Sequence, residues 1–166
     1  MLPIRFKIGI DRFEAFAAAK QVSSLQANHA RPGLGGISRI ELRPVAGPAG
    51  REAVAAVARR CREADPGLAG RFAPEGLVAE LADRPGRRVR AWVATQVGGN
   101  RDEAPSEDVG FLILVEAGQP PRPRFSVAWL LVDPAVRRQG VAMTLVGEAV
   151  RYVRSRGGVE VEAETL

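Results

Sequence analysis

The residues with the clearest chemical potential form one short segment, in which a strongly apolar run leads into a basic loop that contains a glycine. The apolar run ends at Val132, Arg137 and Arg138 lie in the loop, and Gly140 directly precedes an amphipathic stretch that begins at Val141. The first turn of a helix has N–H groups without intrahelical partners and the positive end of the helix dipole, which together favour an anion. A glycine there lets a ligand approach the backbone closely. The segment therefore predicts a phosphate or pyrophosphate site.

Periodic patterns on both sides indicate the elements that must position this segment. Apolar residues at helical spacing predict helices over 51–64, about 77–81 and 141–154. Alternating or continuous apolar runs predict strands over 37–45, 89–97, 109–116, 125–132 and 159–163. This order predicts an α/β fold with a mixed, mostly antiparallel central sheet and flanking helices. The last helix would join two parallel strands as a right-handed crossover.

The first 36 residues differ from the rest of the chain. Residues 4–10 could form a short strand, and Asp11 with Glu14 has the capping-box spacing that opens a helix. Pro32 and three glycines give residues 29–36 the composition of a linker. We therefore divide the chain into an N-terminal arm, residues 1–36, and a domain over residues 37–166.

Composition argues against several classes of function. The single cysteine, Cys61, and the single histidine, His29, cannot supply a thiolate or multi-histidine metal cluster, so we expect no metal. Cys61 lies on the apolar face of its predicted helix, which indicates a structural role. No run approaches the roughly 18 apolar residues that span a bilayer, and charged residues interrupt the N-terminus where a signal peptide would be apolar. We expect a cytoplasmic protein without a membrane partner.

The net charge of +5 does not by itself indicate a nucleic-acid partner. The basic residues are nearly all arginine, Lys7 and Lys20 being the only lysines, and they are spread over the whole chain. Neither a nucleic-acid recognition fold nor an aromatic stacking motif accompanies the charge. We therefore do not expect the protein to bind nucleic acid.

The segment Arg137-Arg138-Gln139-Gly140-Val141-Ala142 resembles the central signature of the GCN5-related N-acetyltransferase (GNAT) superfamily. That signature is Gln or Arg, two residues, Gly, one residue, then Gly or Ala. The preceding strand that ends in Val132-Asp133-Pro134 and the following amphipathic helix strengthen the resemblance, which covers about residues 37–166.

The resemblance implies acetyl-CoA as co-substrate, with no metal. The pantetheine arm would lie along the end of strand 125–132, where that strand and strand 159–163 splay apart, and the pyrophosphate would lie on backbone amides of the signature. The implied cofactor-binding residues are Leu130, Leu131, Val132, Arg137, Arg138, Gln139, Gly140, Val141, Ala142 and Met143. The implied reaction is transfer of the acetyl group to a primary amine of a small molecule or peptide, by direct attack in a ternary complex.

The general base is less evident than the cofactor site. A lysine-like amine has a pKa of about 10.4, so a base would help to deprotonate it. Histone-type relatives carry a glutamate where this chain has Ser126, whereas relatives that acetylate protein N-termini use a glutamate on the strand after the signature helix. Glu162 matches that position best, and Glu116 is a second candidate. Tyr152 lies on the signature helix, not on the later helix that carries the acid tyrosine of the family.

The chain departs from the family pattern at its C-terminal end. The resemblance implies a further helix and strands after residue 163, but the sequence stops at Leu166. We expect either a fragment or a sheet edge completed by the N-terminal arm or by a second chain in a homodimer, because an open edge strand is prone to pairing. Because the C-terminal elements of the family are missing and no general base is evident, an alternative function stays open. The chain could be a catalytically silent module that binds CoA or a protein.

Overall fold

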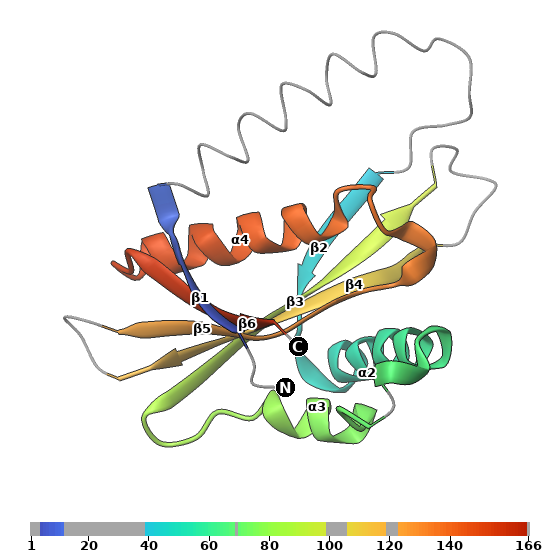
Figure 1. Cartoon of the computed structure of the whole chain (residues 1–166), viewed down its shortest axis with the longest axis horizontal. Coiled ribbons are helices and arrows are strands. Elements are labelled where there is room, and N and C mark those ends of the chain that lie inside the picture. The colour runs from blue at the N-terminus through green and yellow to red at the C-terminus, as the bar shows by residue number, and fades with distance from the viewer. Residues whose placement is uncertain (1–3, 12–38, 69, 99–105, 119–122, 166) are drawn as a thin grey trace, which may run out of the picture.

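The computed structural model describes residues 4–11, 39–68, 70–98, 106–118 and 123–165 of the chain. Within these residues, six strands form one sheet in the order β1-β6-β5-β4-β3-β2 (Figure 1). The strands are β1 (Ile4–Gly9), β2 (Arg39–Pro44), β3 (Arg87–Val97), β4 (Glu107–Ala117), β5 (Arg124–Val132) and β6 (Glu160–Thr165). Neighbouring strands are antiparallel except β5 and β6, which are parallel. The predicted fold class, a mixed and mostly antiparallel sheet with flanking helices, is confirmed.

The helices cover both faces of the sheet, with α4 (Val141–Ser155) on one face and α2 (Gly47–Ala64) with α3 (Pro74–Glu80) on the other (Figure 1). Helix α2 begins four residues before its predicted start, because Pro48 is compatible with the first helical turn. Helix α4 connects β5 to β6 as the predicted crossover. None of the described helices combines the length and the apolar character that crossing a bilayer requires.

Two apolar clusters hold the layers together, one on each face. Successive residues of a strand point to opposite faces, and Leu112 accordingly packs beneath α4 while its neighbour Phe111 packs beneath α2. Both side chains are fully buried. Cys61 belongs to the α2 cluster, and burial, with a smaller contribution from the charge of Asp133, raises its pKa to about 11. Its thiol is therefore protonated at neutral pH and unsuited to nucleophilic chemistry.

The N-terminal strand lies at the edge of the sheet beside β6. Strand β1 pairs antiparallel with β6 along its whole length, from Ile4 opposite Thr165 to Gly9 opposite Glu160. Ile10, just after the strand, is buried in the α4 cluster. The edge of β6 is thus covered within the chain, and a homodimer that paired along β6 would have to displace β1. The predicted N-terminal helix, the linker and the boundary at residue 37 lie outside the described residues.

Gly158, which follows α4, offers a test of this packing. A Cβ atom at this position would lie 2.4 Å from Val153 Cγ1 and 2.5 Å from Phe125 Cε2, both in the α4 cluster. We expect Gly158→Ala to lower the free energy of unfolding by about 1–3 kcal/mol, as overpacking does. The measurement is urea denaturation followed by circular dichroism.

Gly147 provides the matched control. It lies inside α4, and a Cβ there would meet nothing within 4 Å. Because alanine favours a helix over glycine by up to about 1 kcal/mol, Gly147→Ala should leave stability unchanged or raise it. Equal destabilisation by both substitutions would contradict the close packing at Gly158.

Candidate functional site

The parallel strands β5 and β6 are paired over only two positions. Ser126 lies opposite Glu162 and Val127 opposite Ala163. The same register would place Ala128 beside Glu164 and Trp129 beside Thr165, but Glu164 and Thr165 pair only with β1 on their other side. We call the unpaired β6-facing side of Ala128–Val132 the β5–β6 divergence. It is the splaying that the sequence analysis expected between these two strands.

A β-bulge lies at the start of the divergence. On the β4 side, Ile113 pairs with Trp129 and Leu114 with Val127, so Ala128 has no Cα partner on β4. It has none on β6 either. Ala128 is also exposed, although it lies within an inner strand. Because bulges bend a strand and redirect its backbone, this position turns unpaired backbone groups toward solvent where the two strands separate.

Three of the predicted cofactor-binding residues lie along the divergence. Leu130, Leu131 and Val132 pair with β4 on one side and are half-buried. Toward β6 they have no strand partner among the described residues. The backbone groups on that side can therefore pair with an extended ligand, as an added strand would.

The remaining predicted cofactor-binding residues form the loop and first turn that follow β5. Arg137, Arg138, Gln139 and Gly140 are all exposed. Arg138 has a φ of 67° and Gly140 a φ of 87°, so both adopt the left-handed conformation. Within the described chain, backbone hydrogen bonding stops at the Arg137 amide, which donates to Pro134, and resumes at the Thr144 amide, which donates to Gly140. The six amides of residues 138–143 between them have no backbone acceptor.

The arrangement of these amides suits an anion. They surround the N-terminus of the 15-residue helix α4, whose dipole places partial positive charge there. A Cβ on Gly140 would meet nothing within 4 Å, so the space in front of the helix is open. Arg137 and Arg138 add positive charge nearby. The loop thus provides what a pyrophosphate requires, namely several convergent N–H donors and a positive potential.

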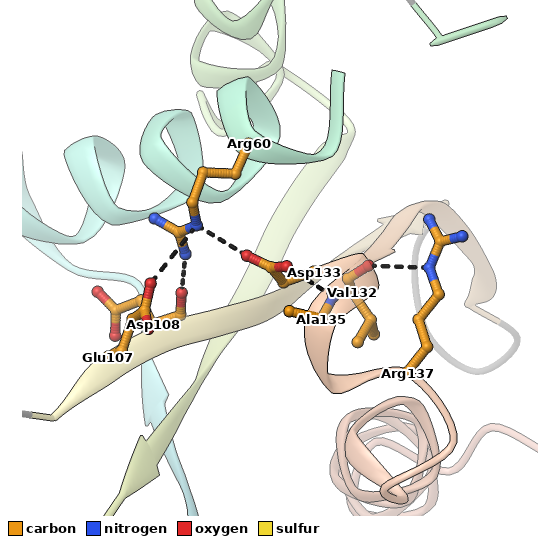
Figure 2. A network of polar contacts seen from close by, with 7 residues as sticks. All are labelled: Arg60, Glu107, Asp108, Val132, Asp133, Ala135 and Arg137. Atoms are coloured by element: carbon orange, nitrogen blue, oxygen red, sulfur yellow. Dashed lines mark hydrogen bonds and ion pairs between the residues drawn. The ribbon is translucent and has the colours of Figure 1, made fainter. Parts of the chain in front are cut away.

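Asp133 anchors this loop to the opposite face of the sheet (Figure 2). One carboxylate oxygen accepts a hydrogen bond from the Ala135 amide at 3.0 Å, and the other accepts one from Arg60 Nε of α2 at 2.8 Å. The Arg60 guanidinium also donates to the carbonyl oxygen of Asp108 on β4 and lies 3.7 Å from Glu107. Helix α2, the start of β4 and the loop are therefore tied together by one arginine and one aspartate.

The electrostatics of Asp133 agree with a structural ion pair. Burial of the carboxyl favours the protonated form, but the hydrogen bonds from Arg60 and Ala135 and the nearby arginine charges outweigh it, so the pKa of Asp133 is lowered. The local sequence pattern assigns no role to Arg60 or to Asp133. The Asp-Pro pair could have indicated a turn cap, whereas an arginine in an amphipathic helix carries no signal of its distant partner.

Glu162, the first candidate base, lies on the face of the sheet away from α4. Its neighbour Val161 packs beneath α4, so Glu160 and Glu162 point to the opposite face. The Lys7 ammonium on β1 lies 3.2 Å from Glu162 and 2.9 Å from Glu160. The Glu162 side chain is about half exposed, at 47%. Glu162 is directly opposite Ser126, two residues before Ala128.

Glu116, the second candidate base, is buried beneath α4 with both oxygens occupied. Tyr152 donates its hydroxyl to Glu116 at 2.9 Å, and Arg156 donates to the other oxygen at 3.1 Å. Only 4% of the residue is exposed. Burial raises its pKa, but the hydrogen bonds from Arg156 and Tyr152 and the charges of Arg156 and Arg88 outweigh burial, so the pKa is lowered overall. The structure therefore does not bring the two candidate bases together.

A cavity of about 460 Å³ opens where β5 and β6 begin. Glu160, Glu162 and Arg124 contribute charged side chains to it, and the Gly157-Gly158 turn after α4 forms part of its wall. In the described part of the chain, no group of three His, Cys, Asp or Glu side chains is arranged to hold a metal ion.

Comparisons with known proteins agree with this geometry. Residues 102–166 match the model of the acetyltransferase (GNAT) family. No curated protein matches the chain significantly in sequence. Among solved structures, a GCN5-related glucosamine N-acetyltransferase region of a fungal multi-domain β-N-acetylglucosaminidase has a TM-score of 0.59 at 15% identity, over 78% of this chain and 14% of that one. This chain thus spans only a small part of that larger protein.

Two further structures are similar over most of their own length. A ribosomal-protein-alanine N-acetyltransferase from Brucella melitensis has a TM-score of 0.52 at 16% identity, over 75% of this chain and 78% of that one. An aminoglycoside N-acetyltransferase in complex with CoA has a TM-score of 0.52 at 17% identity, over 78% of each chain. At these identities the likeness establishes the fold. The family match itself covers residues 102–166, which include the signature segment and α4.

Proposed function

We propose that the protein is an acetyl-CoA-dependent N-acetyltransferase that transfers the acetyl group to a primary amine by direct attack in a ternary complex. One observation carries this proposal: the β5–β6 divergence leads directly to the six open amides at the start of α4. An extended arm ending in a pyrophosphate matches both parts, because unpaired strand backbone suits an amide-containing chain and helix N-terminal amides suit phosphate.

The residues of the chain divide the work of holding this co-substrate. Backbone groups of Leu130 and Val132 would pair with the pantetheine arm along the divergence, whereas those of Leu131 between them face β4. Amides from Arg138 through Met143 would donate to the pyrophosphate, with Arg137 and Arg138 supplying charge. When bound, acetyl-CoA supplies the activated acetyl thioester. The thioester end of the arm would lie near the bulge at Ala128. The side chain there is small and exposed, and the backbone groups have no strand partner.

The position of Glu162 makes it the better candidate for the general base. Ser126 occupies the place where histone-type relatives carry the base, and Glu162 lies opposite Ser126 on the next strand, on the same face of the sheet. A carboxylate there can take a proton from an amine that approaches the divergence from the face away from α4. Glu116 instead lies beneath α4, where Tyr152 and Arg156 occupy both its oxygens.

The charge near the divergence indicates the chemistry of the acceptor. Glu160 and Glu162 line the cavity at the start of β5 and β6 and are balanced by Lys7 in this structure. Two adjacent carboxylates favour a cationic acceptor, such as a polyamine-like or aminoglycoside-like small molecule or a basic peptide. The related structures named above include enzymes for an aminoglycoside and for a ribosomal protein.

Binding of acetyl-CoA should depend on Gly140. At a hundredfold excess over Kd, the ligand should stabilise the protein by about 2.7 kcal/mol and raise Tm by roughly 5–10 °C. We expect Gly140→Val to abolish this rise, because the valine is strained at a φ of 87° and fills the open space before the amides.

Gly86→Val is the control, since Gly86 also has a positive φ, 72°, and open surroundings but lies between α3 and β3. The measurement is differential scanning fluorimetry with and without acetyl-CoA. An unchanged wild-type melting curve at millimolar acetyl-CoA would overturn the proposed function.

Turnover should depend on Glu162 and not on its neighbour. With the best acceptor from a panel of primary amines, we expect Glu162→Gln to lower kcat by roughly 10²–10⁴-fold and to change the shape of the pH–rate profile. Glu160→Gln is the comparison: Glu160 shares the face, the Lys7 contact and the cavity lining but has no partner on β5, so its loss should raise KM for a cationic acceptor and leave kcat unchanged. The assay is release of free CoA thiol. An unaltered profile in Glu162→Gln would remove it as the base, and binding without turnover of any amine would favour the silent module.

Glu116 should affect stability in a pH-dependent way. Its pKa is lower in the folded protein than in the unfolded chain, where it is about 4.3. The carboxylate therefore stabilises the fold fully above about pH 4.3, and this contribution is lost as the pH falls through the lower, folded pKa. We expect Glu116→Gln to be less stable than wild type at pH 7 and to approach it at pH 3, in urea titrations at both pH values. A difference between the two proteins that is the same at both pH values would contradict the ion-paired state of Glu116.

A further inference from the structure

Lys7 occupies a position in which a substrate amine would be expected. Its ammonium lies 2.9 Å from Glu160 and 3.2 Å from Glu162, and the Lys7 side chain is 60% exposed. The hydrogen bonds that the Lys7 ammonium donates to Glu160 and to Glu162 raise the pKa of Lys7. A protonated amine held by the candidate base is the arrangement that precedes deprotonation and acyl transfer.

The strand register places Lys7 beside the β5–β6 divergence. Lys7 pairs with Glu162 across β1 and β6, and Glu162 pairs with Ser126 across β6 and β5. Directly paired residues point to the same face, so Lys7, Glu162 and Ser126 form one row across three strands. Ala128 lies two residues further along β5 than Ser126, and β5 lies two strands from Lys7, so the Lys7 and Ala128 backbones are roughly 12 Å apart at the usual strand spacing and rise. The extended side chain of Lys7 spans about half of that distance, and its ammonium already contacts Glu162 on the intervening strand.

The chain contains very few lysines that could act as acetyl acceptors. Among 24 basic residues, only Lys7 and Lys20 are lysines. Arginine is always protonated in proteins and does not serve as an acyl acceptor of this kind, whereas a lysine can be deprotonated and acetylated. Lys20 lies outside the described residues. The lysine that the structure describes is thus the one that contacts the candidate base.

We propose that Lys7 is a self-acetylation site, the amine of the chain itself acting as acceptor. This inference rests on the proposed function. The Lys7 ammonium gives one proton to the Glu162 carboxylate, and the neutral amine attacks the thioester carbonyl carbon. The N–C bond forms as the C–S bond breaks, the second amine proton goes to the departing thiolate, and Glu162 returns its proton to solvent. The products are Nζ-acetyl-Lys7, CoA thiol and one proton.

The reaction would also change the charge of the acceptor cavity. Acetylation removes the positive charge of Lys7 and its ion pairs with Glu160 and Glu162. Both carboxylates, which line the cavity, are then left without that counter-charge. The cavity becomes more negative and better suited to a cationic acceptor from solution. Self-acetylation would therefore act on the same site that binds the external substrate.

The direct test is acetylation of the full chain by acetyl-CoA without added acceptor, followed by peptide mass spectrometry. We expect Lys7 to be acetylated at least tenfold faster than Lys20, with a first-order rate constant independent of protein concentration. Glu162→Gln should lower the Lys7 rate at least tenfold, and Lys7→Arg should show no acetylation at residue 7. Equal rates at the two lysines, or an unchanged Lys7 rate in Glu162→Gln, would overturn the proposal.

A second measurement does not depend on turnover. Protein labelled with ¹³C-lysine gives only two side-chain Cε signals, and Lys7→Arg assigns that of Lys7. Addition of desulfo-CoA, which lacks the reactive sulfur, should displace the Lys7 signal and leave the Lys20 signal in place. A Lys7 signal that does not move on saturation would show that Lys7 lies away from the bound arm and would overturn the proposal.

The outcomes separate this inference from the function on which it rests. Thiol release with external amines, together with an unmodified Lys7, would overturn self-acetylation alone. Absence of any thermal shift with acetyl-CoA would overturn the proposed function and self-acetylation together. Modification of Lys7 at a rate proportional to protein concentration would show acetylation between molecules and would overturn the self-acceptor assignment.

Discussion

The site depends on one constraint, that β5 is fully paired with β4 but only briefly with β6. A buried strand whose N–H and C=O groups lack partners costs roughly 1–3 kcal/mol for each unsatisfied group, so those groups must face solvent or a ligand. The bulge at Ala128 and the pairing of Glu164 and Thr165 with β1 together produce this separation. The divergence is therefore built into the hydrogen-bond pattern of the sheet and does not require a separate loop or lid.

The elements around the divergence are fixed by contacts that cross the sheet. Arg60 of α2 reaches Asp133 at the end of β5, which in turn holds the Ala135 amide and sets the direction of the loop into α4 (Figure 2). At the other end of α4, Tyr152 and Arg156 hold the buried Glu116 of β4. Each end of the helix is thus positioned relative to the sheet by a carboxylate whose charge is compensated, which is the condition under which buried charge is tolerated.

The N-terminal strand connects the fold with the chemistry of the site. Strand β1 covers the edge of β6 and at the same time brings Lys7 to the two carboxylates at the cavity where β5 and β6 begin. Without β1, β6 would have an open edge on one side and the divergence on the other. One segment therefore completes the sheet and supplies the counter-charge for the candidate base.

The sequence by itself determined the element types, their order and the glycine-containing basic loop before α4, because helical and strand periodicity and the spacing of Arg137, Gly140 and Ala142 are local properties. Only the tertiary structure shows how the surroundings of the two candidate carboxylates differ, since Glu116 and Glu162 lie on opposite faces of the sheet with different partners. It likewise decided that Arg60 holds Asp133 and that Lys7 lies beside Glu162. Arg60 and Asp133 are 73 residues apart, and Lys7 and Glu162 are 155 residues apart. A local sequence pattern does not specify a contact between residues so far apart in the chain.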